Sequence, residues 1–151
     1  MPKDKTGIKG HIKLELFDED GNLKSSFEHS NTITALLDAH VADQMSDSTD
    51  GQIGFMAVGT GSGQGAADTG LTTNNDSNAL TSTTQGAAAA DNDVVYIGDW
   101  AAGDATATIT EAGIFLADNN TTMMAYDDSM NIVKGAADTL KITWTLTFGA
   151  S

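Results

Sequence analysis

The stretch TLKITWTLTF, residues 139–148, alternates strictly between polar and apolar side chains. Successive side chains on a β-strand point to opposite faces, so one face of this segment is wholly apolar and the other is rich in threonine. Its β-branched and aromatic residues also favour a strand. Because a slip of one residue would expose Trp144 and its apolar companions, we predict a long strand of fixed register that covers a core on one side.

Composition limits what the rest of the chain can be. A length of 151 residues is typical of one domain with its own core. The chain has no cysteine, and hence no disulfide or thiolate ligand. No apolar run approaches the ~20 residues that span a bilayer, and residues 1–10 lack the apolar centre of a signal peptide. We therefore expect a soluble protein that is not exported by the Sec route.

The charge is strongly negative, with 21 acidic residues against 7 basic ones and a net charge of −14. Every basic side chain is a lysine, so no arginine fork is available for phosphate or base recognition. Nucleic-acid binding is therefore disfavoured. Most of the lysines lie near the N-terminus, and we predict a basic arm over residues 1–10 followed by one acidic domain over residues 11–151. The N-terminal lysines are Lys3, Lys5, Lys9, Lys13 and Lys24.

The next strong signal is a hairpin. Apolar and polar residues alternate from His11 onward, and the run ends at Asp20-Gly21, a pair typical of two-residue hairpin turns with positive φ at both positions. This turn places Leu14 opposite Phe27 on the buried face and Lys13 opposite Glu28 on the other. It also places His11 and His29 on opposite faces.

After Ser30 the apolar residues recur at helical spacing, at Ile33, Leu36, Leu37, Val41 and Met45. We predict one short helix over residues 32–45, capped by Asn31, Thr32 or Thr34 and packed on the sheet through this apolar stripe.

The remainder reads as short strands and loops. Residues 66–93 have hardly an apolar anchor besides Leu71 and Leu80, so we predict a long irregular loop. The whole pattern predicts roughly seven to nine short strands in an antiparallel β-sandwich or jelly-roll-like fold. The strands expected around that loop cover residues 53–58, 94–97, 106–109, 113–117, 123–126 and 131–134.

Several motifs could carry chemistry, but each has a simpler interpretation. Residues 61–66 match G-x-G-x-x-A, yet no amphipathic helix follows to form a dinucleotide site, so we interpret the glycines as turn residues. Residues 18–22 fit a hairpin tip better than an EF-hand loop. The acidic pairs at residues 91–93 and 127–128 leave a calcium site open. We expect Glu111 to be a structural hydrogen-bond acceptor and not a general base.

The histidines at positions 11, 29 and 40 could form a zinc site only if the helix packs beside the hairpin. The predicted register opposes such a site. No cysteine nucleophile and no G-x-S-x-G elbow is present in the sequence. We therefore expect no enzymatic activity and no cofactor.

Five segments resemble a widespread group of small tailed-phage structural proteins, over roughly the C-terminal two-thirds of the chain. The most specific are ITEAGIF at residues 109–115 and DTLKITW at residues 138–144. The others are AVGTG at 57–61, DTGL at 68–71 and MMA at 123–125. The resemblance implies a virion component, a head decoration or cement protein, with related strand motifs in tail-fibre attachment domains. It implies no catalytic residues.

These observations lead to one functional expectation. The protein is expected to stabilise a phage head by bridging the major capsid protein and sister subunits, as a homo-trimer or other homo-oligomer, with no membrane or small-molecule partner. It would be assembled in the host cytoplasm and reside in the virion. The alternatives are a tail or tail-fibre attachment component and a calcium-dependent adhesin-like module. The candidate interface residues are Lys3, Lys5, Lys9, Leu71, Leu80 and Trp100.

Overall fold

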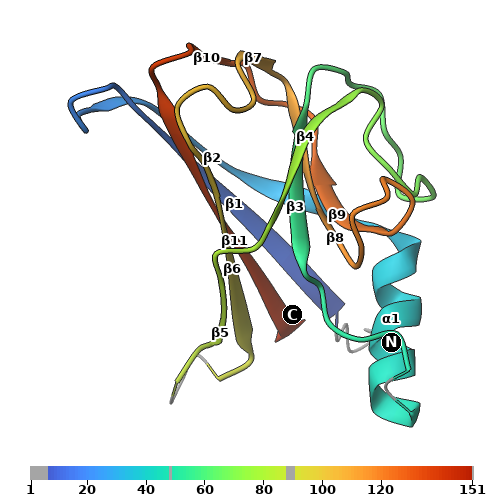
Figure 1. The fold of residues 1–151 in the computed structure, drawn as a ribbon. Coiled ribbons are helices and arrows are strands. Elements are labelled where there is room, and N and C mark those ends of the chain that lie inside the picture. Colours follow the sequence, from blue (N-terminus) through green and yellow to red (C-terminus); the bar gives the residue numbers. More distant parts are fainter. Residues whose placement is uncertain (1–6, 48, 88–90, 151) are drawn as a thin grey trace, which may run out of the picture.

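The computed structural model describes residues 7–47, 49–87 and 91–150. The described chain is mainly β with one short helix. Nine strands form one curled antiparallel sheet in the order β4-β3-β8-β9-β2-β1-β11-β6-β5, and β10 pairs with β7 in a small second sheet (Figure 1). The predicted antiparallel, sandwich-like fold is therefore confirmed.

The elements have the following bounds. The first strands are β1 (Gly7–Phe17) and β2 (Leu23–Ile33), and the helix α1 is Ala35–Ser46. The middle strands are β3 (Phe55–Gly59), β4 (Asn74–Ala79), β5 (Ser82–Gln85) and β6 (Asp93–Trp100). The last are β7 (Ala107–Ile109), β8 (Glu111–Phe115), β9 (Met123–Asp127), β10 (Ile132–Lys134) and β11 (Thr139–Ala150).

β11 is the central strand of a five-stranded layer formed by β2, β1, β11, β6 and β5. The alternation predicted for it is confirmed, because Leu140, Ile142, Trp144 and Leu146 are at most 1% exposed. The threonines of the same strand lie on the outer face and are half-buried or exposed.

The hairpin β1–β2 has the predicted register, with Leu14 opposite Phe27 and Lys13 opposite Glu28. The predicted turn type is wrong. Gly21 has a φ of +83°, but Asp20 does not have positive φ. Instead the Asp18 carbonyl accepts from the Gly21 amide, and the Asp18 carboxylate accepts from the Asp20 and Asn22 amides. Asp18 therefore stabilises a longer loop in which only the glycine needs the left-handed conformation.

The second layer consists of β4, β3, β8 and β9, and β2 joins the two layers. Most of β2 pairs with β1, but its last residues Thr32 and Ile33 pair with Tyr126 and Ala125 of β9. One apolar cluster fills the space between the layers and includes Ile12 of β1, Met56 of β3 and Ile114 of β8.

The helix begins later than predicted because Thr32 and Ile33 belong to β2. Thr34 is the N-cap residue, but its hydroxyl donates to the Met123 and Met124 carbonyls at 2.7 and 3.0 Å and does not cap the helix. Leu37 is buried as expected, whereas Met45 is 83% exposed. The predicted apolar stripe therefore packs on the sheet only in its N-terminal part.

The loop predicted for residues 66–93 is wrong where β4 and β5 form. Apart from Ala79, both strands consist of polar residues, and each is an end strand of the nine-stranded sheet. End strands gain main-chain hydrogen bonds from one neighbour and do not need an apolar face, so their side chains carry little strand signal.

The predicted arm also ends earlier than expected. Residues 7–10 are part of β1, where Gly7 pairs with Ala150 and Lys9 pairs with Thr147. Residues 1–6 of the predicted arm lie outside the described residues. The strands expected after residue 93 are all present, with boundaries that differ by a few residues.

Candidate functional site

The predicted interface residues do not gather on one surface. Lys3 and Lys5 lie outside the described residues, and Lys9 is exposed on β1. Leu71 and Trp100 are only 4% and 1% exposed, so both side chains belong to the chain's own interior. Leu80 is half-buried against the core cluster. The expectation that Leu71 and Trp100 face a partner is therefore wrong. Their apolar side chains are removed from water by the chain's own core and not by a second protein.

The three histidines are far from forming a zinc site. His11 lies opposite Ser30 and His29 opposite Ile12, so the two rings are on opposite faces of the sheet, as predicted. His11 Nε2 instead contacts Glu28 Oε1 at 3.2 Å. Within the described residues, no group of three His, Cys, Asp or Glu side chains is arranged to hold a metal ion.

His29, Asp127 and Ser129 form a cluster that has the residue types of a catalytic triad. His29 Nδ1 lies 2.5 Å from Asp127 Oδ2 and 3.3 Å from Ser129 Oγ. A triad needs the serine and the carboxylate on opposite nitrogens of the imidazole, so that the ring can take the serine proton. Here both contact the same nitrogen, and the cluster connects β2 with the end of β9.

A buried carboxylate organises the glycine-rich end of the molecule. The side chain of Glu111, at the start of β8, is fully buried. Its Oε1 accepts from the Thr73 amide and its Oε2 from Gln64 Nε2, both at 2.9 Å. Glu111 is therefore the structural acceptor that the sequence predicted. The two donors lie on the chain between β3 and β4, so the carboxylate fixes the course of that segment.

The glycines beside Glu111 are required by close packing against its side chain and against the chain at Thr72 and Thr73. A Cβ atom at Gly59 would lie 2.6 Å from Glu111 Oε1, and one at Gly61 would lie 2.9 Å from Oε2. Real Cβ atoms do not approach polar atoms this closely, so only glycine fits at both positions. Thr110 adds a further link, because its hydroxyl donates to the Gly61 carbonyl at 2.7 Å. Of the glycines in the dinucleotide-like motif at residues 61–66, Gly61 thus has a packing role, whereas Gly63 has a φ of +89° and open space beside it, as expected of a turn residue.

Four of the five segments that carry the phage resemblance meet in the layer around Glu111. Residues 57–59 of β3 pair with residues 111–113 of β8, and Phe115 of β8 pairs with Met123 of β9. The Met123 amide also donates to the Thr69 carbonyl in the segment 68–71. The fifth segment contributes β11, on the other side of the core. Segments far apart in the sequence are therefore parts of one packed unit.

The short sheet β7–β10 contains a buried lysine. Lys134 is 1% exposed and its Nζ donates to the Ala101 carbonyl at 3.1 Å, while the neighbouring Val133 is 65% exposed. Burial lowers the pKa of Lys134, and the negative charges of Asp104, Asp138 and Asp76 oppose that shift. Asp138 itself has a lowered pKa, because Lys24 Nζ contacts its carboxylate at 2.8 Å and the Gly135 amide donates to it.

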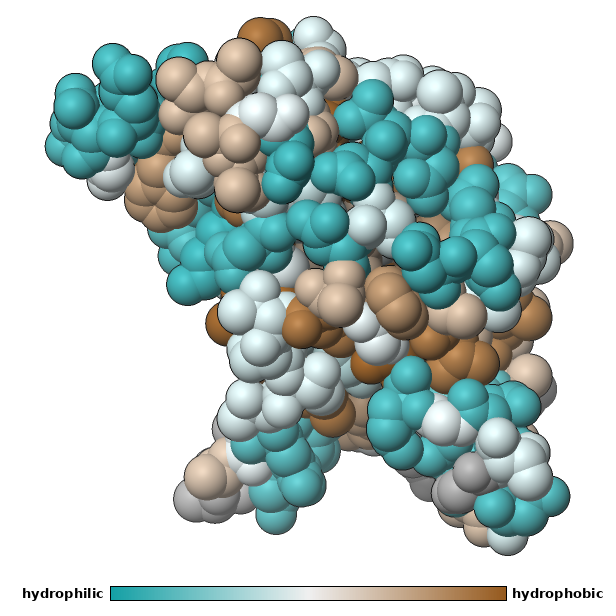
Figure 2. Space-filling model, in the orientation of Figure 1, coloured by the Kyte–Doolittle hydropathy of each residue, from teal (hydrophilic) through white to brown (hydrophobic). Residues whose placement is uncertain are grey.

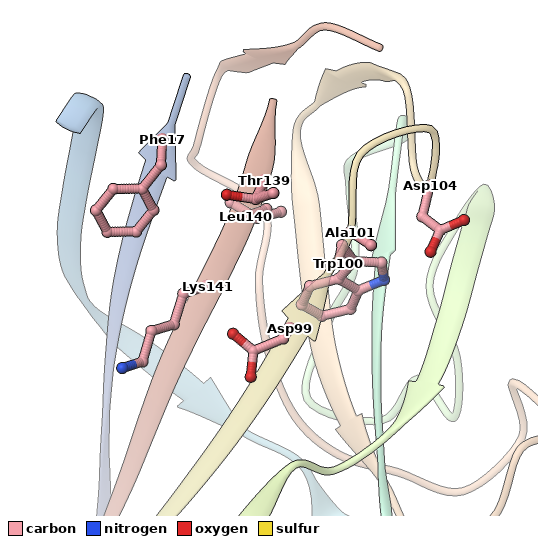
Figure 3. A pocket seen from close by; sticks show the side chains of 8 residues that line it. All are labelled: Phe17, Asp99, Trp100, Ala101, Asp104, Thr139, Leu140 and Lys141. Carbon is pink, nitrogen blue, oxygen red and sulfur yellow. The ribbon is translucent and has the colours of Figure 1, made fainter. Parts of the chain in front are cut away.

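A cavity of about 380 Å³ lies where β1 and β6 end and β11 begins (Figure 3). Its walls mix apolar side chains such as Phe17 with the charged pair Asp99 and Lys141, which lie opposite each other on neighbouring strands. Asp99 also accepts a hydrogen bond from the Thr81 hydroxyl at 2.7 Å. The buried indole of Trp100 forms part of the wall, so its position near a cavity does not make it a surface residue.

A second cavity, of about 270 Å³, lies between α1 and the β5–β6 edge of the sheet, and we call it the α1 pocket. Two nearly buried polar side chains reach it, His40 of α1 and Tyr96 of β6, both 7% exposed. His40 Nδ1 has no hydrogen-bond partner among the described residues. Burial raises the pKa of the Tyr96 phenol to about 12. The apolar wall is formed by Leu37, Val41, Met45, Ile53, Val94 and Phe148.

The sequence contained a weak signal for this pocket. His40 is three residues after Leu37 and directly before Val41, so it lies on the predicted apolar stripe of the helix. A histidine on such a stripe, on a helix that packs against a sheet, is removed from bulk water and needs a hydrogen-bond partner at its buried site.

Among the described residues, no helix is both long enough and apolar enough to cross a membrane. Comparison with known family models gives no match. Comparisons with curated proteins and with solved structures also give no match.

Proposed function

We propose that the protein is a non-enzymatic structural component of a tailed-phage virion, a head decoration protein that binds the assembled shell as a homo-oligomer. The observation that carries this proposal is the meeting of the resemblance segments around Glu111. A chance similarity between short strand sequences would not be expected to pick out residues that contact one another. The pairing of residues 57–59 with 111–113, and the fit of Gly59 against Glu111, are what is expected if the resemblance segments were retained as one packed unit, and they support the proposal in that sense.

The architecture suits this role. A decoration protein needs a stiff framework and contact surfaces distributed over loops and strand edges. The two layers share one continuous core, and β4 and β5 present polar strand edges. Binding to the assembled shell and not to its free subunits would stabilise the shell by the free energy of that binding.

Copy number per particle is the decisive experiment. Purified virions are quantified by mass spectrometry against the major capsid protein, and heads lacking this protein are heated with and without added purified chain. Hundreds of copies per particle and a higher temperature of head disruption on adding the chain are expected. A few tens of copies or fewer, found on isolated tails, would move the protein to the tail or fibre-attachment class.

The adhesin alternative has its own test. If the acidic residues at 91–93 and 127–128 held calcium needed for binding, a chelator would lower the melting temperature of the purified protein. We expect no change, because Asp93 already accepts from the Thr147 hydroxyl, Asp127 pairs with His29, and Asp128 accepts from the Gly63 amide.

A further inference from the structure

We propose that the α1 pocket and the free edge of β5 together bind an extended segment of a partner protein. The segment would add to β5 as an antiparallel strand and place one large aromatic side chain in the pocket. This inference deepens the proposed function, because it names a surface through which the chain joins an assembly and the chemistry of the segment that it takes.

The first argument is the backbone of β5. β5 pairs with β6 in the register Thr83 opposite Tyr96 and Gln85 opposite Val94. The Gly86 amide donates to the Asp93 carbonyl at 2.9 Å, so that pair is hydrogen-bonded. Antiparallel pairs alternate between bonded and non-bonded, which makes the Thr83 and Gln85 pairs non-bonded. The amides and carbonyls of Thr83 and Gln85 therefore point away from β6, toward the open edge.

Within the described residues, no strand pairs with that outer side of β5. An open row of donors and acceptors is a template for another strand, and edge strands are commonly protected by charge, proline or a covering element. The sequence of β5 is STTQ, which has neither charge nor proline. This edge is therefore chemically ready to accept a peptide.

The second argument is the direction of the Thr83 side chain, which lines the α1 pocket together with Tyr96. Residues directly opposite each other on neighbouring strands have side chains on the same face of the sheet. A residue placed opposite Thr83 on an added strand would thus direct its side chain into the pocket. The backbone edge and the pocket are in register with each other.

The pocket determines which side chain fits. A cavity of about 150 Å³ is sufficient for benzene, and the α1 pocket has about 270 Å³. The apolar wall favours an aromatic ring, and the unpartnered Nδ1 of His40 favours a ring with an N–H or O–H group. Tryptophan and tyrosine combine both properties, and such anchors dominate the energetics of many interfaces.

Charge determines what should flank the anchor. No aspartate, glutamate or lysine lines the pocket, in a chain whose net charge is −14. The helix that forms one wall has Asp38 in its first turn, Asp47 as its C-cap residue and no basic residue in its last turn. A segment with lysine near its anchor is therefore favoured over an acidic one.

Figure 2 shows apolar surface in the hollow between the two lower projections of the molecule, which Figure 1 identifies as α1 and the β5–β6 end.

The direct test uses the capped peptide KTWTK as a probe, titrated into the full chain labelled with ¹⁵N. Saturable shifts are expected at the amides of Thr83, Gln85 and Tyr96, with weak, roughly millimolar affinity for so short a strand. Two matched peptides separate the contributions: KTATK lacks the anchor, and KTWTK N-methylated at the tryptophan lacks a strand hydrogen bond. Each should bind at least about tenfold more weakly. Equal binding of all three peptides, or shifts confined to another surface, would overturn the proposal.

Variants of the chain test the same site from the other side. Thr83→Pro removes an outward-pointing amide without breaking a bond to β6, and should abolish binding of KTWTK. Thr83→Phe keeps the backbone intact and places a bulky uncharged ring at the pocket, where it would compete with the anchor. It should also weaken binding, so the test remains decisive if the proline variant folds poorly. Thr84→Ala changes the opposite face of β5 and is the control that should bind normally. Unchanged binding by Thr83→Phe would contradict the proposal.

The outcome is separable from that of the proposed function. A chain that decorates phage heads but ignores KTWTK would refute this inference alone. A chain that binds KTWTK at β5 but never associates with virions would refute the virion role and leave the peptide site standing.

Discussion

The two ends of the sandwich solve the problem of burying polar groups in opposite ways. At the Glu111 end, both carboxylate oxygens have protein donors, and Gly59 and Gly61 leave no room for another side chain. At the α1 end, His40 keeps a buried nitrogen without a described partner, and a cavity of about 270 Å³ adjoins an unpaired strand edge. Figure 1 draws β7 and β10, next to the glycine-rich loops, opposite α1 and β5.

The two ends therefore differ in whether their buried polar groups are already paired within the chain. A satisfied buried network accepts only one arrangement of its loops, because any displacement leaves a buried acceptor without a donor. An apolar pocket with one unpaired polar atom can persist in the folded protein, and a ligand group that hydrogen-bonds to that atom gains binding free energy. The first end fixes the fold, and the second end is open to a partner.

The comparison predicts its largest effect at Glu111. Replacing Glu111 by Ala removes two hydrogen bonds, leaves the buried Gln64 and Thr73 donors without an acceptor, and opens a cavity. The free energy of unfolding should therefore fall by about 2–4 kcal/mol. Glu111→Gln keeps the shape and one acceptor and should lose roughly half as much. Urea unfolding of the three proteins measures both values. A loss below about 0.5 kcal/mol for the alanine variant would mean that this end is not specified by Glu111.

The glycines provide the next largest effect. Gly61→Ala would bring a Cβ to 2.7 Å from Thr72 Cβ and 2.9 Å from Glu111 Oε2, and should destabilise the protein by about 1–3 kcal/mol. The control is Gly65→Ala, because nothing lies within 4 Å of a Cβ at that position. Melting temperatures should fall for the first variant and stay within a few degrees for the second. Equal effects would show that loop flexibility, and not the fit around Glu111, decides the result.

Sequence reasoning succeeded where a single periodic pattern had one solution. The alternation of residues 139–148 has one buried face, and it specified β11 and its one-sided burial. The position of Asp20-Gly21 predicted the hairpin register, which pairs Leu14 with Phe27 and Lys13 with Glu28, and that register is correct although the turn itself differs. The turn geometry was not predicted because it depends on the Asp18 carboxylate, whose hydrogen bonds to two amides favour a longer loop over a two-residue turn.

Sequence reasoning failed where tertiary contacts override local composition. The segment 66–93 has few apolar residues, yet β4 and β5 form because β3 and β6 offer them open hydrogen-bonding edges. Glu111 could be predicted as an acceptor. Its donors Gln64 and Thr73, and the glycines Gly59 and Gly61 that pack against it, could not be predicted because they are distant from it in the sequence. The α1 pocket has no motif, since its walls come from α1, β5, β6 and β11.

A smaller effect distinguishes the two ends by pH. Burial raises the pKa of Tyr96 to about 12 from its usual value of 10.0, so between these values the unfolded chain releases a proton that the folded chain retains. Stability from this group is complete below pH 10 and is lost as the pH rises toward 12. Lys134, at the other end, has a lowered pKa and acts in the opposite direction, because the unfolded chain holds its proton up to about pH 10.5.

Tyr96→Phe isolates the contribution of the pocket. The wild-type protein should lose about 1–2 kcal/mol more than this variant between pH 9.5 and 12, because the variant cannot ionise there. The measurement is the urea midpoint at a series of alkaline pH values, with the two proteins compared at each pH. If the difference between them does not change with pH, the phenol is not held in a dry environment and the α1 end is more hydrated than its geometry indicates.

The smallest effect is expected at the rim of the α1 pocket. Met45 is 83% exposed although it continues the apolar stripe of α1, so its side chain contributes little to the folded state. Met45→Ser should therefore change the free energy of unfolding by no more than about 0.5 kcal/mol. Leu37 belongs to the same helix but is only 1% exposed, so Leu37→Ala serves as the matched comparison. It should lower the free energy of unfolding by about 2–4 kcal/mol. If Met45→Ser leaves stability unchanged but weakens binding of KTWTK, then the exposed methionine acts on a partner and not on the fold, which is the distinction between the two ends in its simplest form.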